Sequence, residues 1–205
     1  MVLMVSFLAS PALAQSRYGP PPTPPPPKSV LDQVGIDQKL GAQVPLDLVF
    51  RDEAGQPIKL ADCFNGRPVV LSLVYYECPM LCSLVLNGMN GAFRSISHDI
   101  GKQYDVITVS FDPREGPQLA QAKKTNYLKA YNRPGADHGW YFLTGEQAQI
   151  KALADSVGFR YAWNEQSRQF AHSAGIIVLT PEGKVSRYLY GLEYSPSDLR
   201  LALME

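Results

Sequence analysis

The sequence lacks a surplus of charge of either sign. Its 205 residues carry 19 lysines and arginines against 19 aspartates and glutamates. Nucleic-acid-binding proteins usually show a basic surplus or a basic stripe, so this class is not expected. Three cysteines are too few for a disulfide scaffold, and no apolar run approaches the ~20 residues that cross a bilayer. What is present is 45% hydrophobic residues, enough for the core of one domain.

The N-terminal residues predict export. Residues 1–14 are almost all apolar or small, carry no charge and end in the small-x-small pattern Ala12-Leu13-Ala14. This is typical of a secretory signal peptide, although the positively charged start is missing. We therefore expect a periplasmic protein; the alternative is a truncated anchor, which leaves a tether to the inner membrane open. Residues 15–34 are rich in proline and predict a semi-rigid linker.

Residues 35–205 predict one α/β domain with a mixed sheet. Residues 44–50 and 56–60 flank a turn and indicate an N-terminal β-hairpin. The apolar, β-branched runs at 69–76 and 105–111 indicate two buried parallel strands at the centre. Alternation of such strands with amphipathic segments is typical of layered α/β folds. The other expected strands are 140–143, 175–179 and 185–190, and helices are expected over 80–100, 119–131, 146–157 and after Ser195.

Cys78 and Cys82 are the most informative residues. They lie where a predicted buried strand turns into a helix, and the carboxyl ends of strands are favoured site positions. Residues four apart share one face of a helix, so both sulfurs can converge on one metal ion or bridge each other. The helix start is expected to lower the pKa of the Cys78 thiol and favour the thiolate. Metal binding and redox chemistry are both open at this point.

A soft metal held by two thiolates needs a further ligand, and imidazole suits copper or zinc. The chain offers three histidines. His98 lies near the polar end of a predicted helix, and His138 lies in a turn before a strand. His172 lies in a predicted loop, residues 169–175, that leads into a strand. On the residues alone His172 is preferred, and His98 is expected to be solvated.

The sequence resembles the Sco/SenC family of copper-handling, thioredoxin-like proteins. The likeness rests on three motifs in order: Tyr-Tyr-Glu-Cys-Pro-Met-Leu-Cys at 75–82, Ser-Phe-Asp-Pro-Arg-Glu-Gly-Pro at 110–117, and His172-Ser173 before a strand and hairpin. It extends over roughly residues 35–205. The resemblance implies a thioredoxin-like three-layer fold with a central mixed sheet and an N-terminal β-hairpin. It also implies that Cys78, Cys82 and His172 bind copper, as Cu(I), Cu(II) or both.

The resemblance further implies a metallochaperone that delivers copper to the dinuclear copper site of cytochrome c oxidase subunit II. The alternative is a thiol–disulfide oxidoreductase in which Cys78 attacks and Cys82 resolves, keeping the cysteines of that site reduced. A structural zinc site would need four ligands, and a peroxidase would need a well-placed arginine; neither is expected.

Several residues depart from the family pattern. Ala171 stands where an aspartate usually precedes the ligand histidine, so Asp112 is our candidate for orienting the imidazole. Its alternative role is to cap the turn before Pro113. Glu77, beside Cys78, is expected to raise the thiol pKa. Core or strand packing is expected for Cys63, Met80, Met89, Tyr75, Tyr76, Trp140 and Trp163. One of the two tyrosines could border the site, and the alternative role of the two methionines is copper ligation. Arg114 and Glu115 are expected in a solvated loop that could also form a docking rim.

Overall fold

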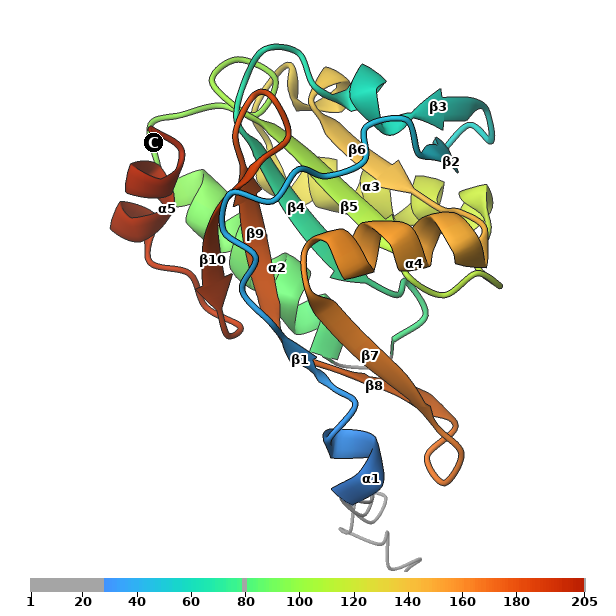
Figure 1. The fold of residues 1–205 in the computed structure, drawn as a ribbon. Coiled ribbons are helices and arrows are strands. Elements are labelled where there is room, and N and C mark those ends of the chain that lie inside the picture. The colour runs from blue at the N-terminus through green and yellow to red at the C-terminus, as the bar shows by residue number, and fades with distance from the viewer. Residues whose placement is uncertain (1–27, 79–80, 205) are drawn as a thin grey trace, which may run out of the picture.

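The computed structural model describes residues 28–78 and 81–204 (Figure 1). The predicted signal peptide, the proline-rich stretch before Lys28, and Pro79 and Met80 lie outside the described residues. The described chain opens with a short helix, α1 (Lys28–Leu31). Among the described residues, no helix combines the length and the apolar character needed to span a membrane.

A five-stranded mixed sheet forms the centre of the fold, in the order β10-β9-β4-β5-β6. Strands β4 (Val69–Val74) and β5 (Asp105–Ser110) are buried at every position and pair in parallel, as their apolar runs predict. β6 (Trp140–Leu143) extends the parallel part of the sheet. β9 (Gly175–Leu179) runs antiparallel to β4, and β10 (Val185–Tyr190) pairs antiparallel with β9.

Helices cover both faces of this sheet (Figure 1). α2 (Leu81–Ser95) and α3 (Pro117–Tyr131) pack against each other behind the sheet in this view, and α4 (Gln147–Ser156) lies in front of it. α5 (Pro196–Ala202) packs beside α2 and is capped by the Ser195 hydroxyl, which accepts the Asp198 N–H. The predicted three-layer α/β arrangement is confirmed.

The helix that carries Cys82 is shorter than predicted. The apolar spacing predicts a helix to residue 100, but α2 ends at Ser95. The Arg133 guanidinium donates hydrogen bonds to the carbonyl oxygens of Arg94 and Ile96, which are groups that the helix end leaves without partners. A long-range contact therefore ends this helix, and the local pattern does not record it.

Two smaller sheets flank the core. β2 (Val49–Arg51) and β3 (Pro57–Lys59) form the predicted N-terminal hairpin, followed by the short 3-10 helix η1 (Leu60–Cys63). A second such turn, η2 (Ala136–His138), precedes β6.

The second small sheet has the order β1-β7-β8, with β1 (Gly35–Ile36), β7 (Phe159–Asn164) and β8 (Gln169–His172). The β7–β8 hairpin is not predicted from the sequence, and the expected loop position of His172 is wrong: His172 is the last residue of β8 and pairs with Tyr161. Most residues of both strands are only half-buried, so they lack the apolar run that marks a buried strand.

Candidate metal centre

Cys78, Cys82 and His172 lie together at one end of the central sheet. Cys78 follows β4, Cys82 lies in the first turn of α2, and His172 ends β8. One ligand atom from each residue, the two Sγ atoms and a ring nitrogen, lies within 4.8 Å of the other two, and all three residues are buried. The topology therefore brings together the three residues that the sequence selects, although they lie on three elements.

One backbone N–H group donates a hydrogen bond to each of the two sulfurs. The Cys82 N–H donates to Cys78 Sγ at 3.3 Å, and the Tyr75 N–H donates to Cys82 Sγ at the same distance. Burial raises the pKa of the Cys82 thiol above its usual range, the contact with Cys78 adds to this, and the Tyr75 N–H opposes it. Without a cation the Cys82 thiol is therefore protonated, and a bound cation has to displace that proton.

His172 presents one nitrogen to the sulfurs and anchors the other. Its Nε2 lies 3.1 Å from Cys82 Sγ, and its Nδ1 lies 3.0 Å from the carbonyl oxygen of Ser173. A carbonyl oxygen only accepts hydrogen bonds, so this contact places the proton on Nδ1. The lone pair of Nε2 is then directed to the cysteines, which is the tautomer that metal ligation by Nε2 requires.

Asp112 does not orient the imidazole, so that expectation is wrong. Its carboxylate accepts hydrogen bonds from the Arg114 backbone N–H at 3.0 Å and from Arg114 Nε at 2.8 Å. Asp112 therefore caps the turn at the end of the strand, through the Arg114 N–H, which is the alternative role considered for it. The Ser173 carbonyl oxygen supplies the acceptor that Ala171 cannot provide.

Aromatic rings enclose the imidazole. The ring centroids of Phe111 and Tyr75 lie 5.2 and 6.0 Å from that of His172, both in edge-on arrangements. Tyr75 is thus the tyrosine that borders the site, whereas the Tyr76 hydroxyl points into the core and donates to the carbonyl oxygens of Thr108 and Leu143. This packing restricts the ring of His172 and excludes water from one side of the cluster.

The other candidate ligands lie elsewhere. His138 is largely exposed beside Asp137, and His98 lies half-buried beyond the end of α2. Cys63 is fully buried, and burial followed by the nearby Asp62 raises its pKa to about 12, so it behaves as a small apolar residue. Met89 is a core residue, as expected.

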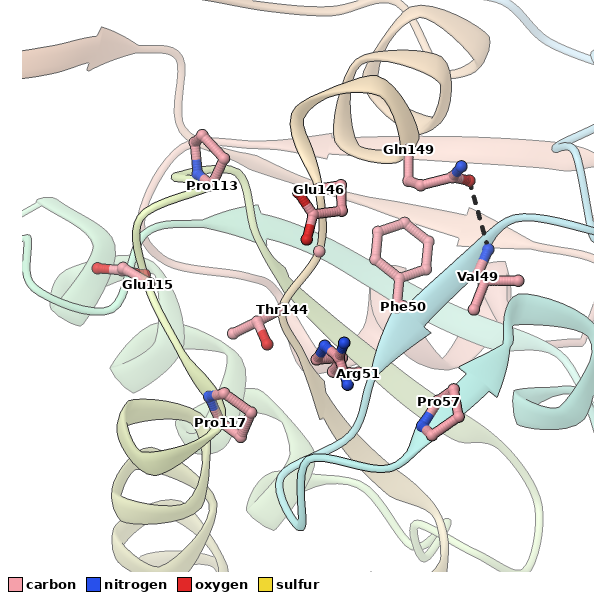
Figure 2. A pocket seen from close by; sticks show the side chains of 11 residues that line it. Val49, Phe50, Arg51, Pro57, Pro113, Glu115, Pro117, Thr144, Glu146 and Gln149 are labelled. Carbon is pink, nitrogen blue, oxygen red and sulfur yellow. Dashed lines mark hydrogen bonds between the residues drawn. The ribbon is translucent and has the colours of Figure 1, made fainter.

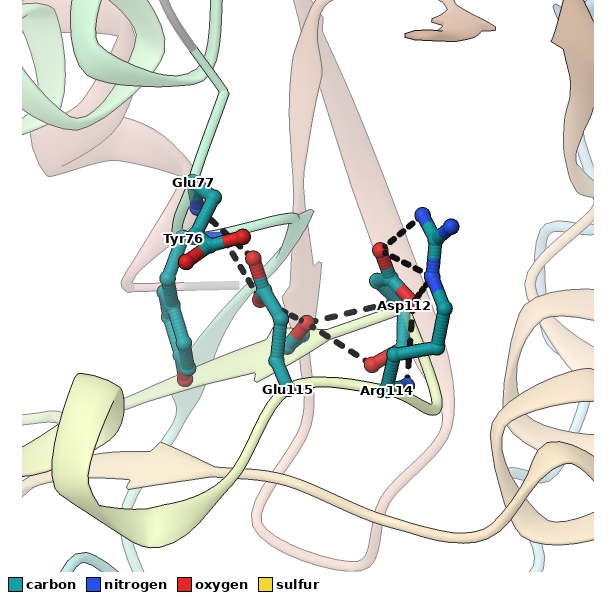
Figure 3. A network of polar contacts seen from close by, with 6 residues as sticks. Tyr76, Glu77, Asp112, Arg114 and Glu115 are labelled. Atoms are coloured by element: carbon teal, nitrogen blue, oxygen red, sulfur yellow. Dashed lines mark hydrogen bonds and ion pairs between the residues drawn. The ribbon is translucent and has the colours of Figure 1, made fainter. Parts of the chain in front are cut away.

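Glu115 differs most from the position expected from the sequence. The predicted solvated loop and the docking rim are both wrong for it, because its side chain is buried. Figure 3 shows its carboxylate directed to the segment before Cys78, where it accepts the N–H groups of Tyr76 at 2.7 Å and Glu77 at 2.6 Å. Trp163 also differs from its predicted core role, since it lies half-buried on β7.

A separate cavity of about 380 Å³ lies between the β2–β3 hairpin, the start of α4 and the loop before α3 (Figure 2). Phe50, Arg51, Pro117 and Glu146 are among its lining residues. None of the three clustered residues lines it.

The donor set fits a soft metal ion. Two sulfurs and one imidazole nitrogen suit copper or zinc. Three donors about 2.0–2.3 Å from one ion lie roughly 4 Å apart, which agrees with ligand atoms within 4.8 Å of one another. Among the described residues the cluster has three members, one fewer than a closed structural zinc site requires.

Comparison with known proteins relates the chain to one family and one fold. A family model described as SCO1/SenC matches residues 37–203. A Stutzerimonas stutzeri protein named for copper binding is 24% identical over 148 residues, covering 70% of this chain and 67% of that protein.

Solved structures of other proteins have the same fold. A crystal structure of an Aquifex aeolicus protein, described as a candidate for electron transfer, is 27% identical with a TM-score of 0.71 and covers 80% of this chain and 92% of that one. Arabidopsis thaliana ScoI with copper bound is 22% identical with a TM-score of 0.59, covering 78% and 93%. The predicted thioredoxin-like fold is thus confirmed.

Proposed function

The chain belongs to the SCO1/SenC family, and on that premise we propose that it binds one copper ion through Cys78, Cys82 and His172. The observation that carries this proposal is the cluster itself: two sulfurs and one ring nitrogen, from three separate elements, within 4.8 Å of one another. The name of the Stutzerimonas stutzeri relative and the copper-bound Arabidopsis structure support copper as the metal.

The residues around the cluster would act in binding as follows. The two thiols give up their protons when copper binds, because thiolate is the ligand form. The N–H groups of Tyr75 and Cys82, already directed at sulfur, stabilise the negative charge. The Ser173 carbonyl oxygen keeps the His172 proton on Nδ1, so Nε2 is ready to bind.

We propose further that copper is cargo, delivered to the dinuclear copper site of cytochrome c oxidase subunit II outside the cytoplasm. Two features support delivery. Three protein donors leave room for a ligand from an acceptor protein, and residues 1–14 read as an export signal. We expect the protein in the periplasm, with the proline-rich residues 15–34 joining the domain to the N-terminus, either free or tethered to the inner membrane.

The geometry favours metal binding over thiol–disulfide exchange at the same cysteines. Exchange needs one attacking and one resolving thiol, and it requires no imidazole. Here Nε2 of His172 lies against the Cys82 sulfur, and the burial that raises the Cys82 pKa opposes the thiolate that exchange would use. Both features suit a site in which a metal ion replaces a proton.

Copper titration of the reduced protein tests the proposal. Wild type is expected to bind one equivalent, His172→Ala to bind more weakly, and the Cys78→Ser/Cys82→Ser variant to bind none. His138→Ala is the matched control, because this exposed imidazole lies outside the cluster. Copper binding that is indifferent to His172 would contradict the ligand assignment. Transfer of the bound copper to a copper-free subunit II domain then tests delivery.

A further inference from the structure

The loop that follows β5, residues 112–115, contacts both segments that carry the clustered residues. Figure 3 shows Glu115 directed to Tyr76 and Glu77 on one side and Asp112 paired with Arg114 on the other. Glu77 immediately precedes Cys78. On the other side of the loop, Arg114 lies over the rings of Trp163 and Phe170, so the 112–115 loop lies between the cysteine segment and the hairpin that ends at His172.

Glu115 binds the cysteine segment through its backbone. One carboxylate oxygen accepts the Glu77 N–H at 2.6 Å, and the other accepts the Tyr76 N–H at 2.7 Å and the Ser110 hydroxyl at 2.5 Å. Hydrogen bonds to a carboxylate are about twice as strong as neutral ones. Two consecutive amides held by one carboxylate fix both the position and the orientation of the peptide that leads into Cys78.

The burial of Glu115 shows how firmly this contact is built. The residue is 6% exposed, and among residues 28–78 and 81–204 it forms no ion pair. Burial raises its pKa, and the three hydrogen bonds from Ser110, Tyr76 and Glu77 oppose that shift. A buried carboxylate without a cation is costly unless such donors satisfy it. Movement of the cysteine segment away from Glu115 would therefore leave the buried carboxylate without two of its hydrogen-bond donors.

Arg114 contacts the other segment. Asp112 fixes its guanidinium through Nε and a terminal nitrogen at 2.8 and 2.6 Å. The guanidinium carbon then lies 4.8 Å from the ring centre of Trp163 and 5.5 Å from that of Phe170, on β7 and β8. Phe170 pairs with Trp163 across the hairpin and lies two residues before His172, on the same face of β8, so this stacking holds the face of the strand that carries His172.

We propose that Glu115 and Arg114 are positioning residues for the metal site: Glu115 holds the peptide before Cys78, Arg114 holds the hairpin that ends at His172, and the loop they share sets the gap between sulfur and imidazole. The inference rests on the proposed function for its copper measurements. The hydrogen-bond contacts can be tested on the metal-free protein.

Glu115→Gln is the first variant. A glutamine amide must turn its NH₂ group toward at least one of the donors that the carboxylate now accepts, so one of these contacts is lost. Amide exchange at Tyr76 and Glu77 should accelerate by roughly 10–100-fold, as expected for loss of a hydrogen bond to a charged group. Copper affinity should fall roughly 10–100-fold, and the sulfur-to-copper charge-transfer absorption of the Cu(II) form should shift.

The controls separate positioning from folding. Glu182→Gln makes the same chemical change on an exposed turn and should alter neither measurement. If Glu115→Gln does not fold, Ser110→Ala is the second variant: it removes the hydroxyl that donates to Glu115 and accepts the Asp112 N–H. The carboxylate keeps its two amide donors, so exchange and affinity should shift in the same direction by less. Faster exchange without any change in copper affinity or absorption would overturn the positioning role. Unchanged exchange would show that the carboxylate does not hold the segment.

Arg114→Lys tests the second contact. Lysine keeps the charge but loses the planar group that pairs with Asp112 and stacks on the rings. Amide exchange in β8 should accelerate and copper affinity should fall. The control is Arg200→Lys, at an exposed position of α5, which should change neither. A wild-type affinity and exchange pattern in Arg114→Lys would overturn its part of the proposal.

Failure of the proposed function would be recognised separately. If wild type takes up no copper, the alkylation rate of Cys78 in the reduced, metal-free protein decides the question. A held cysteine segment predicts that Glu115→Gln raises this rate and that Glu182→Gln leaves it unchanged. Equal rates in all three proteins would overturn the positioning role without reference to copper.

Discussion

Nε2 of His172 lies 3.1 Å from Sγ of Cys82, although 90 positions separate the two residues in the chain. The cysteine is placed by the central sheet and α2, and the histidine by a peripheral hairpin that belongs to a different sheet. The site is thus assembled by the tertiary fold, and its geometry depends on contacts between the two parts. This arrangement makes its properties sensitive to residues that are not themselves ligands.

Copper affinity should rise with pH between about 6 and 8. The Cys82 pKa is raised, so its thiol is protonated throughout this range and must lose that proton when copper binds. Each proton released changes the affinity roughly tenfold per pH unit. Calorimetric titrations in two buffers of different ionisation enthalpy count the protons. His138→Ala should show the same count, and a pH-independent affinity would contradict the displacement of a thiol proton.

Asp112→Asn should leave the tautomer of His172 unchanged. The acceptor for Nδ1 is the Ser173 carbonyl oxygen, 3.0 Å away, and a backbone acceptor survives any side-chain substitution. Nitrogen chemical shifts of the imidazole in the reduced, metal-free protein report which nitrogen carries the proton. A change of tautomer in Asp112→Asn would show that the carboxylate orients the ring after all.

The sequence predicts the parts of this protein that depend on local signals. The runs at 69–76 and 105–111 become adjacent buried parallel strands because continuous β-branched and apolar residues suit a strand covered on both faces. The pair Cys78 and Cys82 is conspicuous because thiols are rare in this chain. The residues alone favour His172 among the three histidines, and the resemblance to a family strengthens that choice, but its segment gives too weak a strand signal to predict β8.

The supporting residues could not be predicted, because their roles come from long-range contacts. Glu115 looks like any loop carboxylate until the fold places it 2.6 and 2.7 Å from two amides that lie nearly forty positions away. The acceptor for His172 is a backbone carbonyl group, which every residue carries and which leaves no mark in the sequence. Such contacts appear only when the whole chain is packed.

Stability should decline as the pH rises from about 9 toward 12, in part through Cys63. Its pKa is about 12 in the folded protein and about 8.5 in an unfolded chain. Because the folded pKa is the higher one, this contribution is fully present below pH 8.5 and is lost as the pH rises toward 12, with an upper limit of about 4–5 kcal/mol. Urea unfolding at several alkaline pH values should show a shallower decline in Cys63→Ala than in wild type. Equal slopes would contradict the raised pKa.

The helix that carries Cys82 should respond very differently to alanine at two of its glycines. A Cβ atom at Gly88 would lie 1.8 Å from the carbonyl oxygen of Leu192, a backbone atom that cannot turn away. Gly88→Ala must therefore push α2 from the segment after β10, and we expect a loss of about 1–3 kcal/mol or more in the free energy of unfolding.

Gly91→Ala is the matched control, because nothing lies within 4 Å of its added Cβ. Alanine is the better helix former, so this variant should be more stable than wild type by about 0.5–1 kcal/mol. Urea unfolding of the two variants beside wild type measures both effects. Similar stabilities for the pair would mean that the contact between α2 and Leu192 is not tight. Opposite signs would show that close packing, and not helix propensity, explains the glycine at position 88.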